Sequence, residues 1–141
     1  TTRMCLGWIA AHEADLRGRR VLDYGCGSGI LAIGAALHGG APIDAVDIDP
    51  AAIATTAQNA ADNGVTLRSG APDMAAGEYP LVLANILATP LKMLAPLLCG
   101  HVAPGGHLVL AGILDRQAGE LKAAYAPWIA LRGATAWTAG S

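Results

Sequence analysis

The chain has 141 residues, of which 53% are hydrophobic and 14% charged, and it carries a formal net charge of −2. This composition excludes a disordered chain and fits one domain that is long enough to bury a sizeable core. The basic residues are scattered apart from a short cluster at residues 17–20, so we expect no broad cationic surface and no DNA partner.

Segments typical of strands and helices alternate along the whole chain. The predicted helices are residues 4–16, 30–38, 50–63, 90–99 and 115–125. The predicted strands are residues 20–24, 43–47, 65–68, 81–84, 107–111 and 130–137. Such alternation predicts an α/β fold, a doubly wound, mostly parallel sheet with helices on both faces, as in Rossmann-like domains. Cap signals support it, because Thr1 or Thr2 can cap the first helix, and Asp49 can cap the helix that Pro50 begins.

Cysteine spacing and hydropathy indicate the cellular compartment in which the protein is expected. Cys5, Cys26 and Cys99 are far apart and form no CxxC pair, so we expect no disulfide framework and no metal site. A reducing cytoplasm is the simplest location for such a chain. We recognise no signal peptide and no apolar run long enough to span a bilayer, so no membrane partner is expected.

Residues 21–29, VLDYGCGSG, combine the end of an apolar strand with a turn of three alternating glycines. Glycine permits the positive φ angles of a tight turn and lets a ligand approach the backbone closely. The helix that follows would present unpaired N–H groups at its N-terminus. We therefore expect this loop to contribute Gly25, Gly27 and Gly29 to a ligand site.

Ligands of doubly wound sheets bind beyond the carboxyl ends of the strands, where the winding reverses. Asp47 ends the second predicted strand, and its carboxylate can accept hydrogen bonds from both hydroxyls of a ribose. The alternative is a turn or capping aspartate, which is the better explanation for Asp49. Asp73 could meet an adenine amino group, although a plain loop aspartate explains it as well.

Two nucleoside ligands fit this pattern, a dinucleotide and S-adenosyl-L-methionine. The dinucleotide fingerprint G-x-G-x-x-G would need a third glycine where Ile30 stands. Asp23 lies beside the loop, and no Lys or Arg occurs between it and Arg68, so a pyrophosphate would meet an uncompensated anion. A ligand with an ammonium group and a sulfonium would be favoured. Asp23 could also serve only as an acceptor for loop N–H groups.

Several segments resemble those of the class I S-adenosylmethionine-dependent methyltransferases. They are VLDYGCGSG, AVDIDP, LVLANIL and PGGHLVLAGIL, together with Thr-Thr before the first helix. More narrowly, they are similar to the catalytic domain of the bacterial ribosomal protein L11 methyltransferase (PrmA) family. The resemblance implies cofactor contacts at Thr2, Gly25, Asp47 and Asn85. It also implies transfer of methyl groups to amines of a protein substrate, a ribosomal protein, with S-adenosyl-L-homocysteine (SAH) as product.

The resemblance also sets expectations for domain organisation. We expect residues 1–141 to form the S-adenosylmethionine-binding domain, without the N-terminal domain that recognises the ribosomal protein in this family. The final strand of the family fold is also expected to be missing.

Asn85, the residue that ends the fourth predicted strand, is the candidate catalytic residue. Its side-chain oxygen could accept a hydrogen bond from an amine N–H and aim the lone pair at the methyl group, without adding a negative charge. A turn residue or helix cap is the alternative. Other functions stay open: methylation of another protein or a small molecule, an NAD-dependent oxidoreductase, and a non-catalytic nucleoside-binding fragment. The expected cofactor-binding residues are Thr2, Asp23, Gly25, Gly27, Gly29, Asp47 and Asn85.

Overall fold

One parallel sheet of six strands organises the fold in the computed structural model, which describes residues 2–86, 91, 93–113 and 115–140. The strand order is β3-β2-β1-β4-β5-β6, and every neighbouring pair is parallel. The strands are β1 (Val21–Tyr24), β2 (Ile43–Val46), β3 (Arg68–Gly70), β4 (Tyr79–Asn85), β5 (Val102–Ile113) and β6 (Thr135–Gly140). The predicted doubly wound α/β fold is confirmed, and the winding reverses between β1 and β4.

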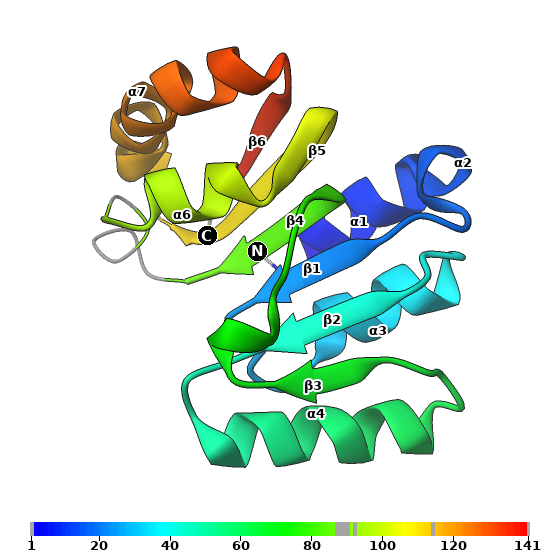
Figure 1. The fold of residues 1–141 in the computed structure, drawn as a ribbon. Helices are drawn as coiled ribbons and strands as arrows, with labels where there is room; N and C mark the ends of the chain where they lie inside the picture. The colour runs from blue at the N-terminus through cyan, green and yellow to red at the C-terminus, as the bar shows by residue number, and fades with distance from the viewer. Residues whose placement is uncertain (1, 87–90, 92, 114, 141) are drawn as a thin grey trace.

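Helices cover both faces of this sheet (Figure 1). They are α1 (Thr2–Ala11), α2 (Glu13–Leu16), α3 (Ile30–Leu37), α4 (Pro50–Asp62), the 3-10 turn η1 (Pro72–Met74), α6 (Ala95–Gly100) and α7 (Asp115–Arg132). Alternate residues of the central strands enter different cores. Leu22 and Val82 pack with α6 and α7, whereas Val21 and Leu81 pack with α1 and α3. Both faces of the sheet are therefore buried, as its continuous apolar strands require.

Two strands differ from the sequence prediction. β3 begins at Arg68 rather than at residue 65, because Val65 still donates its backbone N–H to Ala60 at the end of α4. β4 begins at Tyr79, so Pro80 lies inside the strand and not before it. The register between β4 and β5 shifts at this point, which accommodates a residue without an N–H. β5 begins at Val102 rather than at residue 107, so residues 104–106 fall within the strand, opposite this shift.

Helix boundaries also differ from the prediction at both ends of the chain. The first predicted helix is split into α1 and α2 at His12, whose ring Nδ1 lies 2.7 Å from the carbonyl oxygen of Trp8. The last helix continues through Pro127 to Arg132, so β6 begins at Thr135 rather than at residue 130. Tyr125 and Ile129, on either side of the proline, are both buried in the core and hold the helix in place.

The segment predicted as a helix over 90–99 lies partly outside the described residues, and the part that an element covers is α6. α7 begins at Asp115, the residue at which the predicted helix begins. None of the described helices is both long enough and apolar enough to cross a membrane.

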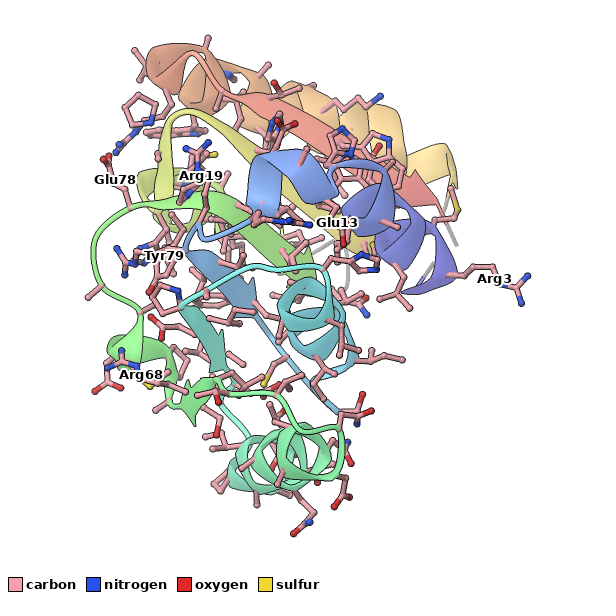
Figure 2. The ribbon with its side chains drawn as sticks, turned by 90° about the vertical axis from the view of Figure 1, so that its right-hand side faces the viewer. Arg3, Glu13, Arg19, Arg68, Glu78 and Tyr79 are labelled. Atoms are coloured by element: carbon pink, nitrogen blue, oxygen red, sulfur yellow. The ribbon has the colours of Figure 1, made fainter. Side chains whose placement is uncertain are left out.

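A buried carboxylate, that of Asp44 in β2, joins β2 to β3, to β4 and to the residue before β1 at the amino ends of the sheet. The hydroxyl of Tyr79 donates to Oδ2 of Asp44 at 2.6 Å, and Nε of Arg68 donates to Oδ1 at 3.0 Å. Arg20 stacks over the Tyr79 ring and reaches within 3.9 Å of Asp44. Arg68 and Tyr79 lie on the same side of the molecule in Figure 2. This network is at the end of the strands opposite to the expected ligand site, so its role is to stabilise the sheet.

Candidate functional site

The glycine loop between β1 and α3 adopts the turn that the sequence predicts. Gly25, Gly27 and Gly29 have φ angles of 79°, 57° and 84°, a region that residues with a Cβ rarely enter. A Cβ placed on Gly25 would also lie 2.8 Å from Cγ1 of Ile86, in the segment after β4. The loop is therefore shaped by backbone conformations and close contacts that only glycine permits.

A cavity of about 670 Å³ opens at the carboxyl ends of β1, β2 and β4. The arrows of these strands point toward the same edge of the sheet in Figure 1. The cavity is lined by Tyr24, Gly25, Gly27, Asp47, Ile48, Pro72, Asn85, Ile86, Met93 and Leu94. Its volume is in the range of small-molecule and cofactor sites. The fold thus brings four of the predicted site residues together: Gly25, Gly27, Asp47 and Asn85.

Asp47 connects the glycine loop to the loop that follows β2. Its Oδ2 accepts a hydrogen bond from the backbone N–H of Gly27 at 3.0 Å, and its Oδ1 accepts one from Asp49 at 2.9 Å. Each carboxylate oxygen has a further lone pair, so these contacts leave acceptor capacity toward the cavity. Asp49, in turn, caps α4 by accepting from the N–H of Ala51, as predicted.

Asp23 lies behind the loop and is not part of the cavity wall. It is only 1% exposed, its Oδ2 accepts from the N–H of Ala32 in α3, and its Oδ1 has no hydrogen-bond partner among the residues that the structure describes. Burial raises the pKa of this carboxyl from 3.8 to about 7; the Ala32 hydrogen bond opposes the shift, and the charge of Asp47 adds to it. The expected alternative role is that of an acceptor for loop N–H groups; the N–H that Asp23 accepts belongs instead to the first turn of α3. A direct ligand contact stays a prediction.

Two further predicted residues, Gly29 and Asp73, are not among the described residues that line the cavity. Gly29 is buried, and a Cβ on it would be 2.8 Å from the methyl carbon of Thr56 in α4. Thr2 is the first residue of α1, and its side chain falls outside the described part of the structure. Asp73 is exposed in η1, next to the cavity-lining Pro72.

Sequence reasoning missed the apolar wall of the cavity and the support of the loop. Ile48 and Met93 are 86% and 79% exposed at the cavity. A usable signal was present, since Ile48 is a large apolar residue between two aspartates directly after a strand. Thr56 and Asn59 of α4 donate hydrogen bonds to the loop carbonyls of Gly27 and Ser28. No motif marks these two residues, because only the packing of α4 on the loop reveals them.

The sheet is doubly wound and parallel, and the glycine turn after its first strand meets the aspartate after its second strand at one cavity. This is the architecture of the nucleotide-binding α/β domains. Within the part of the chain that the structure describes, no group of three His, Cys, Asp or Glu side chains is placed to hold a metal ion.

Comparison with known proteins narrows this class. The model of the family described as "Ribosomal protein L11 methyltransferase (PrmA)" matches residues 1–139. The chain belongs to this family. A ribosomal protein L11 methyltransferase of Polaromonas sp. is 67% identical over 133 residues, which cover 94% of this chain and 45% of the relative. The chain thus spans less than half the length of this relative.

Solved structures agree with the assignment. A ribosomal protein L11 methylase from Lactobacillus delbrueckii subsp. bulgaricus matches with a TM-score of 0.79 and 30% identity, covering 90% of this chain and 68% of the other. Magnesium protoporphyrin IX methyltransferase from Synechocystis, solved with bound SAH, has a TM-score of 0.62 at 21% identity. That match covers 73% of this chain and 54% of the other and shows the shared fold alone.

Proposed function

We propose that this chain is the S-adenosylmethionine-binding domain of a methyltransferase that modifies amines of a ribosomal protein in the cytoplasm. The observation that carries the proposal is the cavity at the carboxyl ends of β1, β2 and β4, in a chain of the PrmA family. The substrate class follows the name of the relatives, ribosomal protein L11 methyltransferase. We assign recognition of the ribosomal protein to a separate N-terminal domain, since the matched part is 42–45% of the relatives' length.

The residues at the cavity fit a cationic nucleoside. Asp47 has acceptor capacity for ribose hydroxyls, and the two glycines let the ligand approach the loop backbone. None of the described residues that line the cavity is basic, so a pyrophosphate would find no compensating charge there. Within the described part of the chain, Oδ1 of Asp23 is a buried acceptor without a partner, which a bound ammonium group could satisfy directly or through water.

When bound, S-adenosylmethionine supplies a methyl group on a sulfonium, which is activated by its charge and needs no metal. The chain's contribution is to position the amine. Asn85, the exposed last residue of β4, can accept an amine N–H with its side-chain oxygen. Because this amide is neutral, it does not favour the protonated, unreactive form of the amine. Ile86, Met93 and Leu94 form an apolar wall that limits water beside the reacting amine.

Calorimetric titration with SAH, S-adenosylmethionine and NAD tests the proposal. We expect the two methionine-derived ligands to bind and to raise the melting temperature, with a stabilisation of about 2.7 kcal/mol at a concentration of 100 Kd. NAD should bind far more weakly. The full-length protein should then transfer methyl groups to a ribosomal protein, detected by mass spectrometry. Tighter binding of NAD, or no stabilisation by either methionine-derived ligand, would refute the assignment.

A further inference from the structure

One face of α4 supports the glycine loop from the side away from β1. Thr56 and Asn59 lie one helical turn apart, so their side chains project from the same face. The Thr56 side chain is fully buried, although most of its neighbours on α4 are exposed. A buried hydroxyl needs a hydrogen-bond partner, and the loop provides it.

Thr56 contacts three residues of the loop, Cys26, Gly27 and Gly29. Its hydroxyl lies 3.1 Å from the carbonyl oxygen of Gly27 and 3.3 Å from Sγ of Cys26, and the single hydroxyl proton is shared between them. Its methyl group occupies the space that a side chain at position 29 would need. The hydroxyl therefore fixes the direction of one carbonyl, while the methyl group sets the distance between helix and loop.

Asn59 holds the next carbonyl of the loop. Its Nδ2 donates to the carbonyl oxygen of Ser28 at 2.8 Å. Two consecutive loop carbonyls are thus bonded to α4. Rotation of the peptide groups that carry them would break these hydrogen bonds, so the helix restricts the one part of the loop that has little side-chain packing of its own.

Gly27 is held at both of its backbone polar groups. Its carbonyl accepts from Thr56, and its N–H donates to Asp47, which lines the cavity. We infer that Thr56 and Asn59 are positioning residues for ligand binding, because through Gly27 and Ser28 they fix the cavity wall and the orientation of the Asp47 carboxylate. This inference rests on the proposed function and assigns it a supporting element outside the cavity.

The test compares substitutions on α4 by calorimetry with SAH and by steady-state kinetics of the full-length protein. Thr56→Val keeps the shape and removes the hydroxyl, Thr56→Ser keeps the hydroxyl, and Thr55→Val is the matched change at an exposed neighbour. We expect Thr56→Val to raise the Kd for SAH and the KM for S-adenosylmethionine about three- to tenfold, the effect of one lost hydrogen bond. The kcat should stay within about twofold of wild type, because Thr56 touches no reacting atom. Thr56→Ser should restore binding.

Asn59→Ala provides an independent arm at a partly exposed position, with Gln58→Ala as its control on the same helix. The Kd for SAH should rise with Asn59→Ala and stay unchanged with Gln58→Ala. A double-mutant cycle of Thr56→Val with Asp47→Ala should show a combined loss smaller than the sum of the two, because both act through Gly27.

The outcomes separate the two proposals. If the wild-type protein binds SAH and both Thr56→Val and Asn59→Ala bind it equally well, the positioning role is refuted while the proposed function stands. Equal losses in Thr56→Val and Thr55→Val would also refute it, since they would indicate a general weakening of α4. If the wild-type protein fails to bind SAH, the proposed function falls, and this inference falls with it.

Discussion

The backbone N–H of Gly27 donates to Oδ2 of Asp47 at 3.0 Å, which ties the turn after β1 to the end of β2. The two residues are 20 positions apart in the sequence and share one wall of the cavity. This contact makes Asp47 serve two purposes, because the carboxylate that would meet a ribose also holds the loop that shapes the rest of the site.

Asp47→Ala should weaken SAH binding roughly 10- to 100-fold, since hydrogen bonds to a charged group contribute about 1.5–3 kcal/mol each. Calorimetry measures the change. Asp73→Ala is the control, because Asp73 is an exposed carboxylate close to the cavity but outside its wall. An Asp47→Ala variant that binds SAH as tightly as the wild-type protein would mean that Asp47 is only a turn residue.

Comparing Gly27→Ala with Gly64→Ala should separate the effect of backbone strain on stability from the effect of a ligand contact on SAH affinity. Gly27 and Gly64 both have positive φ angles, and a Cβ on either would meet no atom within 4 Å. Each Ala variant should therefore lose about 1–2 kcal/mol of unfolding free energy, the cost of the left-handed conformation. Only Gly27→Ala should reduce SAH affinity, because its methyl group would enter the cavity. Similar binding by both variants would place the ligand away from the loop.

Asp23 should make stability depend on pH. Its pKa is raised in the folded state, so the folded chain binds the proton more tightly than the unfolded chain. The associated stability is fully present below pH 4 and is lost as the pH rises through 7. A shift from 3.8 to about 7 corresponds to roughly 4 kcal/mol. Thermal melts from pH 5 to pH 8 should show a decline that Asp23→Asn reduces.

The same variant tests the ligand role of Asp23. If the carboxylate attracts an ammonium group, Asp23→Asn should weaken SAH binding at pH 8, where the wild-type side chain is charged. An unchanged Kd would assign Asp23 solely to the N–H of Ala32, which the structure already shows.

Tyr79→Phe should destabilise the fold without affecting the ligand site. The Tyr79 hydroxyl donates to the buried carboxylate of Asp44, at the opposite end of the strands from the cavity. Removing it should cost about 1–3 kcal/mol in urea denaturation, because a buried acceptor loses a partner. Arg3, which projects from α1 in Figure 2, provides a surface baseline through Arg3→Ala. A Tyr79→Phe variant as stable as Arg3→Ala would contradict this view of the network.

Sequence patterns predicted the sheet and the glycine turn because both depend on local chemistry. The alternation of apolar strands with capped helices fixes the fold class, and Asp49-Pro50 marks the start of α4. The boundaries that failed depend on tertiary contacts. β3 begins only at Arg68 because Val65 is still bonded to Ala60 of α4, and α7 passes Pro127 because Tyr125 and Ile129 pack on both sides of it.

In the candidate site, too, some features could be predicted from the sequence and others depend on tertiary contacts. Gly25, Gly27, Asp47 and Asn85 follow strand ends, so topology alone brings them to one cavity. Asp23 was expected near the ligand because it precedes the loop, but the alternation of a strand turns its side chain toward α3. Exposure and helix packing decide such cases, and neither can be read from residue order.

The support of the glycine loop by α4 also has a consequence for folding. The loop carbonyls that Thr56 and Asn59 bind belong to Gly27 and Ser28, which precede them by 29 and 31 positions in the chain. These hydrogen bonds therefore form only after β2 has paired and α4 has docked. Contacts over such separations close late, because chain entropy must be lost first. A refolding chain should therefore acquire its ligand affinity after the core of β1 and α3 has assembled. Local opening of α4 would release a ligand while the half of the sheet under α6 and α7 stays folded.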